Sequence, residues 1–191
     1  GRSEWDELST AERAKLLGRA GAPALGVSLN VTEDGEICAR SNHVLKGYWN
    51  QPEATNEAIR DGWFHTGDGG YVDEDNYVTI ADRLKDVIIS GGENISSIEV
   101  EDVLFAHEQV TEVAVIGVPD EKWGETVKAL VVIEGDISEK ELIEFCRSKL
   151  AHYKCPTSIE FRDELARTAT GKLQKYKLRA PYWEGHDKLV N

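Results

Sequence analysis

The sequence has few cysteines, the residues whose disulfides are typical of small secreted proteins. Among its 191 residues there are three cysteines, Cys38, Cys146 and Cys155, and no methionine. An odd number of cysteines without a close pair argues against a disulfide framework and against a zinc knuckle. We therefore expect a reducing, cytoplasmic setting. The chain begins at Gly1 with neither an initiator methionine nor a signal-peptide pattern, so we interpret it as a segment of a longer protein.

Long apolar runs are also missing. The longest ones, such as Ala129–Ile133, are far shorter than the roughly 20 residues that a membrane helix needs. We expect no transmembrane segment. Hydrophobic residues nevertheless make up 40% of the chain and charged residues 30%, which is typical of a folded globular protein and not of a disordered one.

Positive charge is scarce. The chain has 22 Lys and Arg against 35 Asp and Glu, a formal net charge of -13. This charge repels nucleic acid and gives no general steering to an anionic ligand, so no nucleic-acid partner is expected. A bound nucleotide would need local positive charge, and a run of basic residues without an acid extends from Arg167 to Arg179. The five histidines show no metal-ligand spacing, so no metal site is predicted.

The first 82 residues are predicted to be rich in β-structure. Ser9 and Glu12 have the spacing of a capping box, which predicts a helix through about Leu17. Alternating apolar residues and turn signals then predict two strands, a short helix and a hairpin, with irregular structure or a further strand at 43–48. The predicted elements are strands at 27–31 and 35–40, a helix at 53–59 and a hairpin at 71–80.

From Arg83 onwards strands and helices alternate. The charged stretch Asp82–Asp86 separates the two patterns and resembles an interdomain joint. Ser138 and Glu141 form a second capping box, and Cys146 follows at a helical core position, so we expect it to pack and not to react. The predicted elements are strands at 87–89, 113–118, 126–133 and 157–161, helices near 98–107 and 138–150, and a short basic helix at the end. They indicate an α+β domain over 83–191.

Two motifs contain residues that could bind a nucleotide. In Gly62–Asp68 an acid stands on a glycine-containing turn, where a carboxylate can accept hydrogen bonds from a ribose diol. A turn acid that only caps its own backbone is the alternative. In Asp82–Ile95, Arg83 offers a planar fork of donors, and adjacent glycines allow a ligand to approach the backbone. The alternative for Gly91 and Gly92 is a simple turn from strand to helix.

A third motif, Arg167–Leu173, places Lys172 on a Thr- and Gly-containing loop. A lysine there can bring a compact positive charge to a carboxylate and a phosphate as they react. A phosphate-binding loop would require Gly at position 166 and Ser or Thr at position 173, and the chain has Ala166 and Leu173. That alternative therefore fails.

Taken in order, these segments resemble the acyl-CoA synthetase branch of the adenylate-forming superfamily, and the similarity extends over nearly the whole chain from Gly21. The matching stretches are 46–50, Lys-Gly-Tyr-Trp-Asn; 63–68, Trp-Phe-His-Thr-Gly-Asp; 82–86, Asp-Arg-Leu-Lys-Asp; 89–95, Ile-Ser-Gly-Gly-Glu-Asn-Ile; and 168–172, Thr-Ala-Thr-Gly-Lys.

The resemblance implies a fold and a division of the chain. Residues 1–82 would be the β-rich tail of a large N-terminal adenylation domain, and 83–191 the mobile α+β C-terminal lid domain, with a hinge at about 83–86. The family's triphosphate-binding loop and its adenine and acyl pockets lie upstream. The missing N-terminal domain would therefore be this chain's partner, and the chain alone is expected to be inactive.

The resemblance also implies the roles of individual residues. Asp68 and Arg83 would bind the ribose of ATP, and Lys172 would stabilise the charge that develops during adenylation. Lys85 would be the hinge about which the lid rotates. The face formed by Ser90, Gly91 and Gly92 would then meet the pantetheine arm of CoA, so that one domain serves both half-reactions.

The implied reaction joins a small-molecule carboxylic acid to CoA at the expense of ATP, with Mg2+ bound mainly alongside ATP. A fatty acid is the expected substrate from overall resemblance alone. Two departures stand out: Ala166 replaces the usual proline before the lysine loop, and the segment between Val31 and Glu36 is short. The alternatives are a non-catalytic lid-like binding module and an adenylation enzyme that loads a carrier protein.

Overall fold

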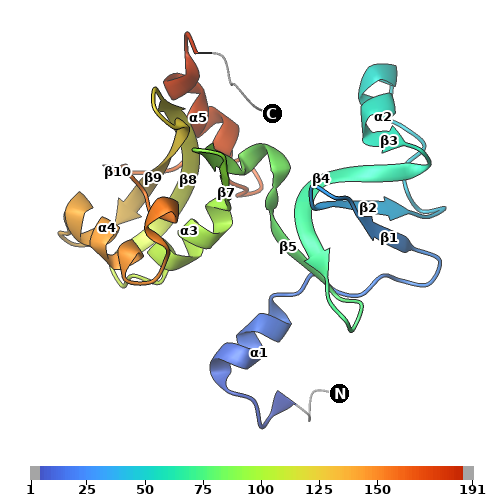
Figure 1. Ribbon diagram of the computed structural model, residues 1–191, viewed down its shortest axis with the longest axis horizontal. Coiled ribbons are helices and arrows are strands. Elements are labelled where there is room, and N and C mark those ends of the chain that lie inside the picture. Colours follow the sequence, from blue (N-terminus) through green and yellow to red (C-terminus); the bar gives the residue numbers. More distant parts are fainter. Residues whose placement is uncertain (1–4, 187–191) are drawn as a thin grey trace. The chain divides into compact units, whose positions relative to one another are not determined.

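The computed structural model describes residues 5–186, which form two compact units that divide between Leu84 and Lys85 (Figure 1). The boundary predicted from the sequence, after Asp82, lies two residues earlier. No helix within the described residues has the length and hydrophobicity required to cross a membrane.

The first unit is a helix followed by an antiparallel sheet centred on β4. Strand β4 pairs with β2, β3 and β5, and β1 pairs with the outer edge of β2. The elements are α1 (Thr10–Leu17), β1 (Ser28–Val31), β2 (Glu36–Arg40), α2 (Pro52–Ala58), β3 (Ile59–Arg60), β4 (Trp63–Val72) and β5 (Val78–Arg83). Helix α1 begins at the predicted capping box, in which the backbone N–H of Glu12 donates to Ser9 Oγ and the N–H of Ser9 donates to Glu12 Oε2.

Residues 43–48 are irregular, which is one of the two alternatives predicted for them, and contribute an isolated bridge between Tyr48 and Gln51. One expectation for this unit was wrong. The motif Gly62–Asp68 is not a tight turn ahead of a hairpin, because β4 begins at Trp63 and runs through it. Inside the motif the register between β2 and β4 shifts, and the side chains of Glu36 and Thr66 bond to the backbone there. Strand β4 therefore continues through residues that look like a turn in the sequence.

The second unit has a mixed five-stranded sheet with helices on both faces. Its strand order is β10-β9-β6-β7, with β8 paired to β9, and among the described strands of this sheet only the β10–β9 pair is parallel. The elements are η2 (Leu84–Asp86, which spans the division), β6 (Ile88–Ser90), β7 (Glu93–Ile95), α3 (Ser97–Phe105), β8 (Val110–Asp120), β9 (Gly124–Ile133), α4 (Glu139–Arg147), η3 (His152–Lys154), β10 (Ser158–Phe161) and α5 (Lys175–Trp183). The predicted α+β class is confirmed.

Strands β8 and β9 are buried on both faces, which explains their nearly continuous apolar sequence. On one face Val115, Val127 and Val131 pack with residues of α3 and α4 in the main core. On the other face Ala114, Ile116 and Leu130 pack with Leu165 and are covered by Leu173, Leu178 and Tyr182. Figure 1 shows α5 on the face opposite α3 and α4. The sheet therefore supports the end of the chain that carries the lysine loop.

Cys146 is fully buried in the main core, as predicted. Helix α4 follows its N-cap Ser138, whose side chain accepts from the N–H of Glu141 in the second capping box. Full burial of an aliphatic side chain such as Leu142, on the same helix, contributes about 1.5–3 kcal/mol. The helix is thus specified twice, by its cap and by its apolar face.

Candidate functional site

The structure brings the two predicted ribose-binding residues together. Asp68 in β4 and Arg83 at the end of β5 are direct partners in the antiparallel ladder. Arg83 Nε lies 3.6 Å from Asp68 Oδ1, and both side chains remain open to solvent, at 60% and 32% exposure. A carboxylate and a guanidinium held side by side on neighbouring strands offer both acceptors and donors to a polar ligand.

Asp68 belongs to a bulge in β4. Glu36 of β2 faces Gly69, and Cys38 faces His65, so the three residues Thr66, Gly67 and Asp68 stand opposite the single residue Ile37. A bulge bends its strand and re-aims the side chains on it, and such features are frequent beside active sites. Gly67 has a φ of +73°, a conformation that favours glycine.

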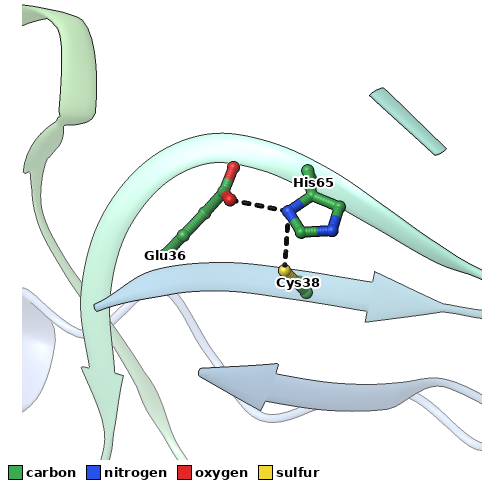
Figure 2. A group of neighbouring side chains, drawn as sticks. All are labelled: Glu36, Cys38 and His65. Atoms are coloured by element: carbon green, nitrogen blue, oxygen red, sulfur yellow. Dashed lines mark hydrogen bonds and ion pairs between the residues drawn. The ribbon is translucent and has the colours of Figure 1, made fainter. Parts of the chain in front are cut away.

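Sequence reasoning missed the side chains under this bulge. Glu36, Cys38 and His65 place their ligand-type atoms within 4.8 Å of one another, as Figure 2 shows. His65 Nδ1 lies 2.6 Å from Glu36 Oε2 and 3.4 Å from Cys38 Sγ. Glu36 and Cys38 lie in β2, whereas His65 lies 27 residues beyond Cys38 in β4, so a search for local metal-ligand spacing could not find the three together.

We interpret this cluster as a hydrogen-bonded support and not as a metal centre. Carboxylate, thiol and imidazole are a donor set that zinc accepts. However, Arg60 NH2 lies 2.8 Å from His65 Nδ1 and brings a positive charge to the place a cation would take. Glu36 Oε1 already accepts from the backbone N–H of Gly67. Burial raises the pKa of the Cys38 thiol, which disfavours the thiolate that binds metal.

Lys85, the predicted hinge, lies in η2 where the two units divide. Its side chain is exposed, and its backbone carbonyl accepts from Arg179 NH1 at 2.9 Å. The same guanidinium nitrogen is 3.8 Å from Asp86 Oδ1. Helix α5 thus holds the second half of η2, whereas Arg83 belongs to the ladder of the first unit.

Ser90, Gly91 and Gly92 stand at the turn between β6 and β7. Both glycines have positive φ, at +60° and +87°. A Cβ on Gly91 would come within 2.7 Å of the Trp123 ring, so glycine is needed here for space as well as for conformation. The turn is therefore a hairpin between two strands and not the strand-to-helix turn considered from the sequence.

Trp123 is half exposed and borders a cleft of about 860 Å3 within the second unit. The lining residues include Ile89, Gly92, Trp123, Glu125, Tyr182 and Trp183. Glu125 is itself buried. The Gly91–Gly92 turn therefore forms part of the wall of a sizeable concave surface with aromatic and acidic groups.

Lys172 is presented by a small hairpin with its own hydrogen bonds. The N–H of Thr168 donates to the carbonyl of Lys172 at 2.8 Å, and the N–H of Lys172 donates to Thr168 Oγ1 at 3.0 Å. Arg167 and Leu173 bridge at its base. The Lys172 side chain is exposed, and its ammonium forms no hydrogen bond or ion pair within residues 5–186.

Ion pairs hold both ends of this hairpin, and sequence reasoning did not identify them. Arg167 donates through Nε and NH2 to Glu112 Oε2, at 3.1 and 2.6 Å, and through NH1 to the carbonyl of Gly171 at 2.9 Å. On the far side Lys175 Nζ lies 2.7 Å from Glu101 Oε1. An exposed Arg-Glu pair contributes little alone, but this one also satisfies a loop carbonyl. The hairpin is thus anchored to β8 and α3.

Comparison with known proteins gives a consistent result. Residues 99–172 match the model of the AMP-binding enzyme C-terminal domain. The chain is 44% identical over 192 residues to 4-hydroxybutyrate–CoA ligase 2 of Metallosphaera sedula, covering 93% of this chain and 35% of that protein. It is 49% identical over 150 residues to the long-chain-fatty-acid–CoA ligase FadD13 of Mycobacterium tuberculosis, covering 78% of this chain and 30% of that protein.

Solved structures agree. ATP-bound MatB from Rhodopseudomonas palustris superposes with a TM-score of 0.83 at 38% identity, over 89% of this chain and 37% of that one. The o-succinylbenzoate CoA synthetase of Bacillus subtilis, in complex with an acyl-adenylate intermediate, gives 0.81 at 37% identity, over 90% of this chain and 37% of that one. The chain spans about a third of the length of the relatives it matches.

Proposed function

We propose that this chain, which carries the C-terminal domain of AMP-binding enzymes and corresponds to the C-terminal portion of an acyl-CoA synthetase, supplies the lid and hinge of an ATP-dependent carboxylate–CoA ligase. The observation that carries the proposal is the clamped hairpin of residues 167–173, which presents an exposed lysine ammonium. This hairpin ends the segment that matches the family model.

The proposed reaction has two steps. In the first, a carboxylate oxygen of the acid attacks the α-phosphorus of ATP, an O–P bond forms, and pyrophosphate leaves as its bond to that phosphorus breaks. In the second, the sulfur of CoA attacks the acyl carbonyl carbon and loses its proton, and AMP leaves with the electrons of the C–O bond. Mg2+ would enter with ATP and balance the charge of its phosphates.

Asp68 and Arg83 are proposed to hold the nucleotide in both steps. Asp68 would accept hydrogen bonds from the two ribose hydroxyls, and Arg83 would donate to the ribose or to a phosphate oxygen. Their exposure and their 3.6 Å separation support this assignment, because a ligand can reach both without displacing packed side chains.

Lys172 is proposed to act in the first step only. A positioned ammonium stabilises the negative charge that develops as the carboxylate meets the α-phosphate, and in a site closed to water this effect is large. Within residues 5–186 the partners of the hairpin belong to the second unit, so its hydrogen bonds do not depend on the first. The lysine would then move as one body with the second unit.

Lys85 is proposed to be the residue about which the units rotate between the steps. Hinges are short segments at the ends of elements that absorb a change of φ and ψ, and η2 is a single turn directly at the division. Rotation would withdraw Lys172 and bring up the Ser90–Gly92 turn. Its glycines would let the CoA arm approach the backbone closely.

Substitution of the lysine in the full-length enzyme tests this proposal. Lys172→Ala should slow adenylation roughly a hundredfold, about 2.7 kcal/mol, as expected for the loss of one electrostatic donor. Pyrophosphate exchange measures that step, and thioester formation from synthetic acyl-adenylate measures the second, which should change little. Lys177→Ala, an exposed lysine on α5, is the matched control. Equal losses in both steps would contradict the assigned role.

A further inference from the structure

Glu36 is an ionisable side chain that none of the proposed chemistry uses, although it is only 7% exposed. Acidic side chains are almost never buried unless they are paired, because removal of a carboxylate from water is costly. Glu36 begins β2, next to the strand that carries Asp68. Its burial therefore calls for a structural account.

The carboxylate of Glu36 accepts one hydrogen bond from the backbone of the β4 bulge. Its Oε1 accepts from the backbone N–H of Gly67 at 3.0 Å. The bulge is completed from the neighbouring residue, where Thr66 Oγ1 donates to the carbonyl of Ile37 at 2.6 Å and accepts from the N–H of Asp68 at 3.1 Å. The backbone on the N-terminal side of Asp68 is thus held by Glu36 and Thr66.

The other carboxylate oxygen is fixed from the opposite side. His65 Nδ1 lies 2.6 Å from Glu36 Oε2, and Arg60 NH2 lies 3.6 Å from the same oxygen (Figure 2 shows the Glu36–His65 contact). A charge-assisted hydrogen bond, such as the one between His65 and Glu36, is stronger than a neutral one. With one oxygen bound to the bulge and the other to the imidazole, the carboxylate has little freedom to rotate.

We propose that Glu36 is a positioning residue that sets the direction of Asp68 and thereby the affinity for the ribose of the nucleotide, with His65 orienting Glu36. Glu36 reaches no ligand itself. The inference rests on the proposed function, because it gives Asp68 the ribose as its ligand. It adds roles for two residues, Glu36 and His65, and one contact, Glu36 to the Gly67 amide, that the proposed roles do not contain.

The test uses the full-length enzyme and a double-mutant cycle. Glu36→Ala should raise KM for ATP at least about tenfold, the scale of one or two lost hydrogen bonds to a ligand, with a smaller change in kcat. Asp68→Asn should raise it as well. Because Glu36 acts through Asp68, the double variant should be no worse than Asp68→Asn alone, whereas independent effects would multiply.

A second readout on this chain does not depend on activity. Glu36→Gln keeps an acceptor for the Gly67 amide but removes the charge, and serves where Glu36→Ala fails to fold. Its expected signs are an altered Gly67 amide resonance and faster amide exchange at Gly67 and Asp68. Glu57→Gln, an exposed acid in α2, makes the same charge change away from the bulge and should alter neither.

The outcomes separate the inference from the function on which it rests. An unchanged KM in the Glu36 variants, or multiplied effects in the double variant, would overturn the positioning role even if the Gly67 amide is perturbed. If Asp68→Asn leaves KM for ATP unchanged, the ribose assignment itself fails and the inference fails with it. If the effects of the two substitutions on KM for ATP do not multiply and the Gly67 amide is perturbed, both the positioning role of Glu36 and the ribose assignment of Asp68 are supported.

Discussion

At the scale of single residues, burial sets the properties of the three thiols. Cys38, Cys146 and Cys155 are all free and buried. Burial raises the pKa of Cys146 to about 12, with a further contribution from the neighbouring Cys155. Burial likewise raises the pKa of the Cys38 and Cys155 thiols. Since the thiolate is the reactive form, none of the three is suited to act as a nucleophile.

We therefore expect the folded chain to resist thiol reagents. At pH 8 an aromatic disulfide reagent should label the native chain far more slowly than a free thiol and should count three cysteines only after unfolding in denaturant. Absorbance of the released thiolate measures both phases. Cys146→Ser should reduce the final count by one without speeding the native reaction. Rapid labelling of any thiol in the folded chain would contradict the burial described for it.

At the scale of elements, the lysine hairpin combines exposure with restraint. The ion pairs Arg167–Glu112 and Lys175–Glu101 tie the hairpin to β8 and α3. The Lys172 ammonium is exposed and forms no ion pair with residues 5–186. A short exposed loop would otherwise sample many conformations, at a cost of about 1–2 kcal/mol for each residue that must be ordered. Because the ion pairs already order part of the hairpin, less conformational entropy is lost when a substrate binds.

Removal of the arginine should loosen the hairpin. In Arg167→Gln we expect amide exchange at Thr168 and Lys172 to speed up by roughly fivefold or more, which corresponds to about 1 kcal/mol of lost local stability. Exchange mass spectrometry or NMR on this chain measures it. Arg147→Gln is the matched control, because Arg147 forms a 2.6 Å ion pair with Glu144 at similar exposure, on α4. Equal acceleration in the control variant would show that the clamp has no specific effect.

Most elements could be predicted because their signals are local. The capping boxes at Ser9 and Ser138 mark the starts of α1 and α4, and apolar alternation marks β1 and β2. Strand β7 was missed, because Glu93 and Asn94 are polar and it is only three residues long at a sheet edge. Strand β8 spans Val110–Asp120 and is longer at both ends than the strand predicted at 113–118.

The predicted site residues divide along similar lines. Sequence motifs picked out Asp68 and Arg83, and the structure pairs them, but motifs cannot reveal what lies beneath a bulge. Glu36 is 31 residues from the amide that it supports, and Arg167 is 55 residues from Glu112. Such partners are brought together by strand register and helix packing, which depend on the whole fold. Supporting contacts are therefore the part of the site that sequence reasoning leaves out.

At the scale of the whole molecule, the proposed groups for the chemistry are spread over both units. Asp68 and Arg83 lie before the division at Leu84 and Lys85, while Lys172 and the Ser90–Gly92 turn lie after it. The relatives are about three times as long as the matched region, and the family resemblance implies that the acid and triphosphate sites lie in the remainder. A lid that supplies one charge and one backbone turn should need that remainder in order to act.

Pyrophosphate release from ATP and a mixture of carboxylic acids tests this account most directly. It is measured with this chain alone, with the separately expressed upstream part of the enzyme, and with both together. We predict release only from the mixture and its loss when the chain carries Lys172→Ala. Release by this chain alone would contradict the proposed lid role, and so would a mixture that is no more active than the upstream part, given an active full-length enzyme.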